Sequence, residues 1–588
     1  MRQLLFIFFT SFSLIAQNNP LYLDSNANLE DRLSDLMARM TLEEKVGQMC
    51  QYVGLEYLKK QKRNKRAAGD VSKLNKDAFA MYGLSESEII QEIIDGKIGS
   101  FLHVLDPEEV NYLQGFTLES RLKIPLIIGI DAIHGNAMVS GTTVYPSPIS
   151  IAATFNNDFA YDVAKQSARE MRATGSQWTF MPNIDVARDP RWGRVGETFG
   201  EDPFLVGEMG KAMINGFQGD DFGKPNNVIA CAKHMIAGAE PLNGLNISPM
   251  DVSERSLYEI HLPPYKKAID AGVYSIMAAH NELNGIPSHM HKGLMTDLLR
   301  NEWGFDGFYV SDWYDIKRIW SYHKVARNYK EASLFSVEAG MDMNMHGPDF
   351  YDFIVALVKE NKLSIDRVNE ACSKILYAKF QLGLFENRLV DPSKIDKNVF
   401  IKNHLDKAEE IADNSITLLK NNNLLPINNS NAKRILVTGP NAHNHTTLGD
   451  WHFEQPAENV VTIFEGIQEV GENYNHTVDY FDSGIKIRNI QDSKIKATAA
   501  MSINYDHVFV VVGDNSLRYS WKGGKSFQKT AGENKARSFL GLPGKQLDLV
   551  KSIYDKNKNL TVVYISGKPI SEPWIEDNIK SIIHAWEP

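Results

Sequence analysis

The sequence predicts an α/β protein in which a barrel domain precedes an α/β sandwich domain, and three observations support this. First, 588 residues are too many for one ordinary domain, and 43% hydrophobic with 23% charged residues is typical of a globular protein. Second, short apolar runs alternate with helical stretches over the first two thirds of the chain, which predicts repeated βα units and a parallel sheet. Third, further apolar runs between helical stretches follow Ser415. Because so many βα units in one domain favour a closed ring, we expect a TIM-like (β/α) barrel.

Several apolar runs are predicted to be barrel strands. They are Ile98 to Val104, Pro125 to Asp131, Trp178 to Asp185, Val228 to Lys233, Tyr274 to His280, Phe308 to Asp312 and Met341 to Met345. Before them, Asn28 to Gln51 has the spacing of amphipathic helix, and Thr41 is the expected N-cap of a second helix. A last barrel helix is expected between a Ser364 cap and a Gly383 stop.

We expect the barrel over residues 17–387, a linker over 388–410 and the sandwich over 411–588. The linker prediction rests on a stretch with Asn, Pro, Asp and Lys but without strong periodicity. Strands of the second domain are predicted at Arg434 to Pro440, Val508 to Gly513 and Leu560 to Gly567. The sequence stops on another apolar run that begins at Ser581, with no closing helix after it, so we expect this second domain to be incomplete.

The N-terminal residues have the features of a secretory signal. A basic start at Arg2 precedes an apolar core, and Ala16-Gln17 is a plausible cleavage point. Residues 1–16 are therefore expected to be a signal peptide, with an uncleaved anchor as the minor alternative, and the protein is expected to be periplasmic or secreted. The three cysteines are odd in number and far apart, so they predict buried hydrophobic residues and not a disulfide framework.

The overall charge limits the classes of partner. A formal net charge of -10 repels polyanions, which argues against nucleic acid and against an anionic membrane surface. The apolar run near the N-terminus is short for a membrane span, so no integral membrane span is expected. A neutral substrate such as a glycan is compatible with this charge, and the sequence permits a homodimer.

Polar residues close several of the predicted barrel strands. The strand ends are Asp131, Asp185, Lys233-His234, His280 and Asp312. Because the carboxyl ends of barrel strands meet at one mouth, this set predicts an active site there. A lone Asp after a strand is more often a helix cap, and for Asp131 and Asp312 that alternative stays open when each is judged alone.

Two of these strand ends carry a family resemblance. Residues 307–313 read Gly-Phe-Tyr-Val-Ser-Asp-Trp, which resembles the nucleophile strand of glycoside hydrolase family 3, the family of many β-glucosidases and β-xylosidases. The resemblance implies that Asp312 is the catalytic nucleophile and that Trp313 is an aromatic platform beside the sugar. Residues 129–135 match a family Gly-x-Asp-x-x-His-Gly pattern, which implies that Asp131 accepts hydrogen bonds from sugar hydroxyls.

Further motifs extend the resemblance over nearly the whole chain. In the longest match, Asp185 to Pro203, the family implies that Arg191 holds a glycan hydroxyl, while Glu197 and Asp202 are not expected to be catalytic. The pair Lys233-His234 is expected to contact the same sugar ring. His280 occupies a position that is often Tyr in the family, so it is expected either to hydrogen-bond near the nucleophile or to be structural.

The second carboxylate is expected from the second domain. Residues 531–537 read Ala-Gly-Glu-Asn-Lys-Ala-Arg and resemble the family loop that carries the proton donor, which implies Glu533 as the acid/base; an ordinary exposed Glu is the alternative. We expect Glu533 to stay protonated in a partly apolar pocket and Asp312 to stay ionised beside cations, as a retaining glycosidase requires. No metal ion or other cofactor is expected.

The expected activity is that of a retaining, exo-acting β-glucosidase, like the periplasmic β-glucosidases of bacteria. β-Xylosidase or arabinosidase activity is the first alternative, because the same catalytic pair serves pentoses. A glycan-binding protein that has lost catalysis is the second. The retained Asp312 and Glu533 argue against it.

Overall fold

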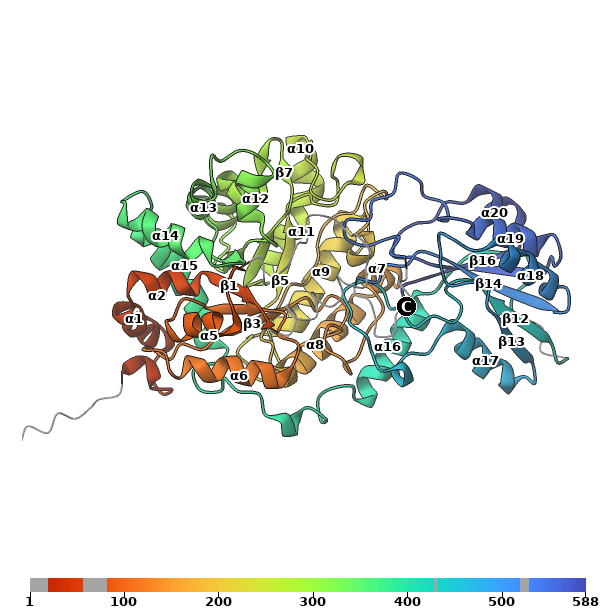
Figure 1. Cartoon of the computed structure of the whole chain (residues 1–588), viewed down its shortest axis with the longest axis horizontal. Helices are drawn as coiled ribbons and strands as arrows, with labels where there is room; N and C mark the ends of the chain where they lie inside the picture. The colour runs from red at the N-terminus through yellow and green to blue at the C-terminus, as the bar shows by residue number, and fades with distance from the viewer. Residues whose placement is uncertain (1–19, 56–81, 428–430, 519–527) are drawn as a thin grey trace, which may run out of the picture.

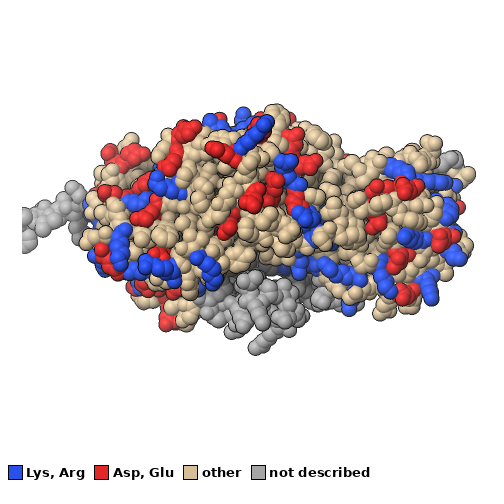
Figure 2. Space-filling view, turned by 90° about the horizontal axis from the view of Figure 1, so that it is seen from above, with Lys and Arg blue, Asp and Glu red and all other residues tan. Residues whose placement is uncertain are grey.

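The computed structural model describes residues 20–55, 82–427, 431–518 and 528–588. The predicted signal peptide lies outside these residues. Two bodies lie side by side along the long axis, the first coloured red to green and the second blue (Figure 1). In the described part of the chain, no helix is both long and apolar enough to cross a membrane. Lys, Arg, Asp and Glu are interspersed over both bodies on the face in Figure 2, so this face has no field of one sign.

The first body is a closed barrel of parallel strands. In ring order these are β1 (Cys50–Val53), β2 (Ser100–Leu102), β3 (Ile127–Ile130), β4 (Trp178–Thr179), β5 (Cys231–Met235), β6 (Ser275–Ala278), β9 (Phe308–Val310) and β10 (Asn344–Met345). Parallel bridges between Trp178 and Ile229 and between Val310 and Met343 join the two groups of strands. The ring therefore follows chain order, and the predicted TIM-like barrel is confirmed.

Helices surround the ring in the described part of the chain. They are α1 (Leu29–Arg39), α2 (Leu42–Gln48), α5 (Glu86–Ile94), α6 (Pro107–Thr117), α7 (Pro148–Ala153), α8 (Asn157–Thr174), α9 (Pro203–Gln218), α10 (Glu254–Ser256), a one-turn π-helix (Leu257–His261), α11 (Leu262–Asp270), a second π-helix (Gly293–Glu302), α12 (Asp315–Ser321), α13 (Tyr329–Glu338), α14 (Asp349–Lys359) and α15 (Ile365–Gln381). The predicted caps are confirmed: Thr41 forms a capping box with Glu44, and the Ser364 hydroxyl accepts a hydrogen bond from the Asp366 N–H. A small hairpin, β7 (Glu282–Leu283) with β8 (Ile286–Pro287), follows β6.

Two elements differ from the sequence-based prediction. Residues up to Gln51 were expected to be helical, but β1 begins at Cys50; its four residues are all buried, so they lack the alternation that identifies a strand. The end of the predicted linker is helix α16 (Lys402–Ser415), which packs against α7 and α8 of the barrel. Before it, residues 388–401 are irregular apart from a short 3-10 helix, Pro392–Lys394. The three cysteines are free and buried, as predicted.

The second body is a sheet covered on both faces. Its strand order is β11 (Thr417–Asn421), β16 (Ser581–Trp586), β15 (Leu560–Ile565), β14 (His507–Gly513), β12 (Arg434–Thr438) and β13 (Thr477–Phe481), with β11 antiparallel. Alternate residues of β14 face two separate cores: Val508, Val510 and Val512 lie in one, and Phe509 and Val511 in the other. Helices α17 (Ile463–Asn473), α18 (Asp492–Ser502), α19 (Gln546–Tyr554) and α20 (Pro573–Asn578) accompany the sheet, which confirms the α/β sandwich.

Loops of the second body pack onto the mouth of the barrel. The Gly532 N–H donates to the Gly193 carbonyl at 2.7 Å, and the Phe453 N–H donates to the Ala137 carbonyl at 3.0 Å. His134 of the barrel lies 2.6 Å from the Asp450 carbonyl oxygen. The barrel mouth is therefore completed by residues that come several hundred positions later in the chain.

Candidate active site

The nucleophile candidate Asp312 lies directly after β9, at the barrel mouth. Its Oδ2 is 3.2 Å from His280 Nε2 and 3.7 Å from His234 Nε2, and its backbone N–H donates to His289 Nε2 at 2.9 Å. Helix α12 begins only at Asp315, after Tyr314, so Asp312 is not its cap. Burial raises the pKa of the Asp312 carboxyl, while His280 and Arg194 act in the opposite direction.

Asp131 belongs to a buried group of three polar residues. Lys233 Nζ lies 2.6 Å from its Oδ1, and His103 Nε2 lies 2.8 Å from its Oδ2. Burial alone would raise the pKa of Asp131, but Lys233 and His103 lower it to about 2. Asp131 is thus an ionised acceptor at the mouth and not a helix cap.

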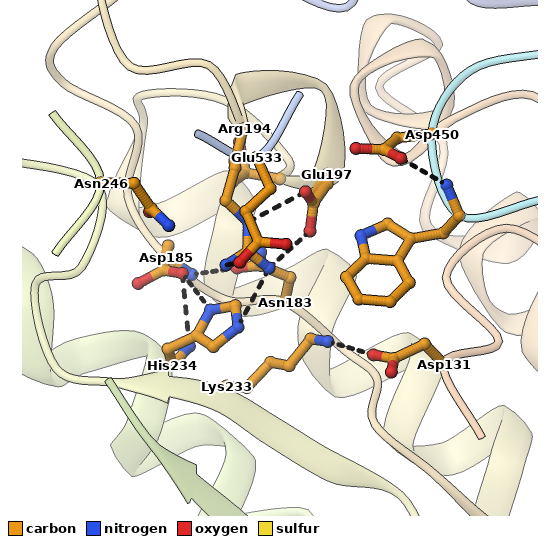
Figure 3. A network of polar contacts seen from close by, with 12 residues as sticks. Asp131, Asn183, Asp185, Arg194, Glu197, Lys233, His234, Asn246, Asp450 and Glu533 are labelled. Atoms are coloured by element: carbon orange, nitrogen blue, oxygen red, sulfur yellow. Dashed lines mark hydrogen bonds and ion pairs between the residues drawn. The ribbon is translucent and has the colours of Figure 1, made fainter. Parts of the chain in front are cut away.

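A second set of contacts joins the ends of β4 and β5 (Figure 3). His234 Nδ1 lies 2.8 Å from Asp185 Oδ2, and Arg194 lies 3.2 Å from His234 Nε2. Arg194 also binds both oxygens of Glu197, at 2.9 and 2.8 Å. Burial raises the pKa of Asp185 to about 7. Glu197 is therefore held by an arginine, in agreement with its expected non-catalytic role.

The arginine at the site is not the expected one. Arg191 pairs with Asp189 at 2.7 Å and its side chain is 41% exposed, whereas Arg194 is 3% exposed and faces His234 and Glu533. The structure therefore replaces Arg191 with Arg194 as the arginine of the candidate site. Sequence spacing could not separate them, because both lie in one loop three positions apart.

The second domain contributes an aromatic residue and several charges. Trp451, 9% exposed, lies with its ring centroid 5.3 Å from Lys233 Nζ and 3.6 Å from the Arg518 guanidinium carbon. Asp450 is paired with Arg518 at 3.0 Å and with Lys529 at 3.1 Å. Trp451, Asp450, Arg518 and Lys529 belong to none of the motifs identified in the sequence. The sequence signal that could have identified Trp451 as a site residue is a large aromatic side chain in a segment without helix or strand periodicity.

Glu533 reaches the barrel mouth from the loop after residue 527. It forms an ion pair with Arg518, and its Oε1 lies 3.4 Å from His280 Nε2 and 3.9 Å from Arg194. Burial opposes ionisation, but Arg518 and Arg194 hold the pKa of Glu533 well below its usual range. The expected apolar pocket that keeps Glu533 protonated is therefore wrong: the carboxylate is surrounded by cations.

His280 lies between the two candidate carboxylates. Its Nε2 contacts Asp312 and Glu533, and its Nδ1 lies 2.7 Å from Asp315 Oδ2. Among the described residues, only His280, Asp312 and Asp315 bring three ligand atoms close enough for a metal ion. The short Nδ1 contact requires a proton between a nitrogen and a carboxylate, so these are the contacts of a hydrogen-bonded imidazole. Trp313 is half-buried beside the His346 ring at 4.2 Å.

The fold and the site together define a glycoside hydrolase. A carboxylate at the end of a barrel strand faces a second carboxylate across a mouth lined with sugar-compatible polar groups and a Trp. The family models for the glycosyl hydrolase family 3 N-terminal and C-terminal domains match residues 41–378 and 416–588, so the chain belongs to glycosyl hydrolase family 3.

Known proteins resemble the chain over most of its length. A β-xylosidase of Formosa agariphila is 36% identical over 84% of this chain and 70% of its own. A periplasmic β-glucosidase of Salmonella typhimurium is 30% identical over 94% of this chain and 70% of its own. The crystal structure of a β-glucosidase from Listeria innocua in complex with glucose superposes with a TM-score of 0.82, at 30% identity, over 96% of this chain and 73% of its own.

Proposed function

We propose that the protein is a retaining, exo-acting β-glucosidase that removes terminal non-reducing β-D-glucosyl residues through a covalent glycosyl-enzyme. The observation that carries this proposal is that Asp312 and Glu533 lie within 3.2 and 3.4 Å of the same nitrogen of His280. Two carboxylates that contact one nitrogen atom favour the short separation of about 5–5.5 Å in retaining enzymes over the wider separation that inverting enzymes need for a water molecule.

The proposed roles follow from the positions of the side chains. Asp312 attacks the anomeric carbon, and Glu533 serves the leaving oxygen and then the attacking water. Asp131, Lys233, His234 and Arg194 bind the hydroxyls of the sugar at the bottom of the mouth. Trp313 and Trp451 supply the aromatic surfaces that pack against its ring.

The test uses aryl β-glucoside and aryl β-xyloside with the purified protein. The glucoside should be hydrolysed with retained configuration. Asp312→Ala should abolish turnover. Glu533→Ala should also lose turnover, and added azide should restore part of the activity of this second variant. A matched control is Asp202→Ala, because Asp202 caps α9 by accepting hydrogen bonds from the Phe204 and Leu205 N–H groups. This change should affect stability and not turnover. Glucoside turnover that survives Asp312→Ala would contradict the assignment.

β-Xylosidase activity is the second candidate, because the Formosa agariphila β-xylosidase is 36% identical over 84% of this chain. A higher kcat/KM on the xyloside, lost in the same Asp312 variant, would replace the glucosidase proposal while keeping the mechanism. A folded chain that binds glucose but turns over neither substrate would support the inactive glycan-binding alternative.

We also propose export to the periplasm or outside the cell. The signal-like residues 1–16 and the periplasmic name of the Salmonella relative support this. Cell fractionation with N-terminal sequencing tests it, since the exported chain should start at Gln17. Homodimer formation stays a prediction, and light scattering of the purified protein tests it.

A further inference from the structure

We propose that His280, oriented by Asp315, stores the catalytic proton and passes it to Glu533. This inference rests on the proposed glycosidase function and adds a proton-carrying dyad to it. It starts from a difficulty at Glu533, which must donate a proton but is held as a carboxylate. Of its described ion-pair partners, Arg518 and Arg194 do not release protons in proteins. The third partner, His280, is the one that can.

In the dyad formed by His280 and Asp315, the imidazole is directed toward both candidate carboxylates. Asp315, at the first residue of α12, is 1% exposed, and its Oδ2 lies 2.7 Å from His280 Nδ1. Because the Asp315 carboxylate can only accept and its contact is shorter than that of the Arg318 guanidinium at 3.1 Å, we assign a hydrogen to Nδ1, and this hydrogen bond orients the ring. Nε2 then points between Asp312 Oδ2 at 3.2 Å and Glu533 Oε1 at 3.4 Å. No rotation of the ring is needed for a proton to move from Nε2 to Glu533.

The charges around His280 favour the imidazolium. Three carboxylates face it from three elements: Asp312 after β9, Asp315 in α12 and Glu533 from the second domain. Cationic and titratable groups that oppose a positive charge on His280 also lie near it. Arg318 is 3.1 Å from Nδ1, the ring of His234 stacks at a centroid distance of 6.3 Å, and Arg194 contacts the far side of His234. His289 contacts Asp315, and His323 contacts the His280 carbonyl oxygen. Burial opposes the charge, yet Asp312 and Asp315 raise the pKa of His280 to about 10. At neutral pH the proton therefore lies on His280 and not on Glu533.

The proton balance closes over one catalytic cycle. In the first step the Nε2 proton moves to Glu533 Oε1 and on to the leaving oxygen, as the glycosidic bond breaks and Asp312 forms its bond to the anomeric carbon. His280 is then neutral and keeps its Nδ1–H on Asp315. In the second step water gives a proton to Glu533, its oxygen displaces Asp312, and the proton returns to Nε2.

The test compares leaving groups. The phenolate of phenyl β-glucoside is a poor leaving group and needs protonation by an acid, whereas the dinitrophenolate of dinitrophenyl β-glucoside leaves without it. His280→Gln should therefore lower kcat/KM about 10²-fold on the phenyl substrate but about tenfold or less on the dinitrophenyl substrate. The matched control is His404→Gln, because His404 forms an equally buried contact with Glu170 at 2.9 Å in α16 and α8, away from the mouth. It should lower stability without changing the ratio of the two rates.

A second variant covers the case in which His280→Gln does not fold. Asp315→Asn keeps an acceptor for Nδ1–H but removes the charge, so the basic limb of kcat/KM on phenyl β-glucoside should move down by about one pH unit or more. A purely structural His280 would give equal losses on both substrates and an unmoved basic limb, and this result would overturn the proposal.

An NMR measurement separates failure of this inference from failure of the proposed function. Isotope-labelled histidine, with the His280→Gln spectrum for assignment, should show an imidazolium at His280 at about pH 8. A neutral ring there overturns the proton store even if the enzyme is active. No turnover of either glycoside, with an imidazolium present, would refute the glycosidase function and with it the catalytic role of the dyad.

Discussion

Arg191 and Arg194 lie in one loop, and Arg194, not Arg191, faces the candidate site. Their alanine variants can therefore be compared directly. Arg194 is 3% exposed and binds both oxygens of Glu197, whose side chain is 4% exposed. Arg194→Ala leaves the buried Glu197 carboxylate with only the more distant Arg518, at 3.8 Å, among the described residues. Because breaking a buried ion pair costs about 3–5 kcal/mol when no other charge remains, the expected loss lies at or below the lower end of that range. The same change removes a cation 3.9 Å from Glu533, and loss of such a charge at a reacting centre lowers kcat by about 10²–10³. Among the described residues Arg191 is paired with Asp189 alone, and its side chain is 41% exposed, so Arg191→Ala should change stability and kcat little.

The assay measures the denaturant midpoint and kcat/KM on an aryl glycoside for both variants. Arg194→Lys keeps the charge but not the two parallel hydrogen bonds, so it should fall between wild type and Arg194→Ala. Adding Glu197→Gln to Arg194→Ala should recover part of the stability and little of the activity, because it removes the buried charge but not the need for a cation at the mouth. Equal losses in Arg191→Ala and Arg194→Ala would refute the reasoning.

Three further predictions concern the contact between the domains. A Cβ at Gly193 would lie 2.2 Å from the Gly532 carbonyl oxygen, so Gly193→Ala should displace the Glu533 loop and lower kcat. The control is Gly115→Ala, where a Cβ would meet no atom within 4 Å and kcat should not change. Equal kcat values in the two variants would contradict this prediction. Trp451→Ala should lower stability by about 3–5 kcal/mol and raise KM; an unchanged KM would remove it from the sugar site. Burial raises the pKa of Glu587 to about 7. The folded state therefore keeps a proton that the unfolded chain releases above about pH 4.3. The free energy of unfolding should fall as the pH rises from about 4.3 to about 7. Glu587→Gln should therefore melt above wild type at about pH 8 but not at about pH 5, and a uniform shift would argue against this titration.

Much of the barrel and of its mouth could be predicted from local patterns. An apolar run followed by Asp312, or by Lys233-His234, is visible in the sequence because the apolar residues are contiguous and the polar residues after them stand out. The parallel topology then brings those ends together without further information. β1 was missed because four fully buried residues carry no period, and a helix pattern runs directly into them.

The electrostatic state of the site could not be read in the same way. Glu533 was identified by its loop motif, but its surroundings are Arg518, Arg194 and His280, which lie 15 to several hundred residues away in the chain. A pKa depends on the charges within a few ångströms and on burial, and neither has a local sequence signature. The expectation of an apolar pocket failed for this reason.

The sequence by itself determined the fold class, the order of the domains and the residue types at the strand ends, because these depend on periodicity and on neighbours along the chain. Tertiary structure alone decided that Arg194 and not Arg191 faces the candidate site, and that Trp451 lies beside Lys233. It also decided that His280 connects Asp312, Asp315 and Glu533. Those relations depend on which distant segments pack together, and packing sets both the distances and the dielectric in which the charges act.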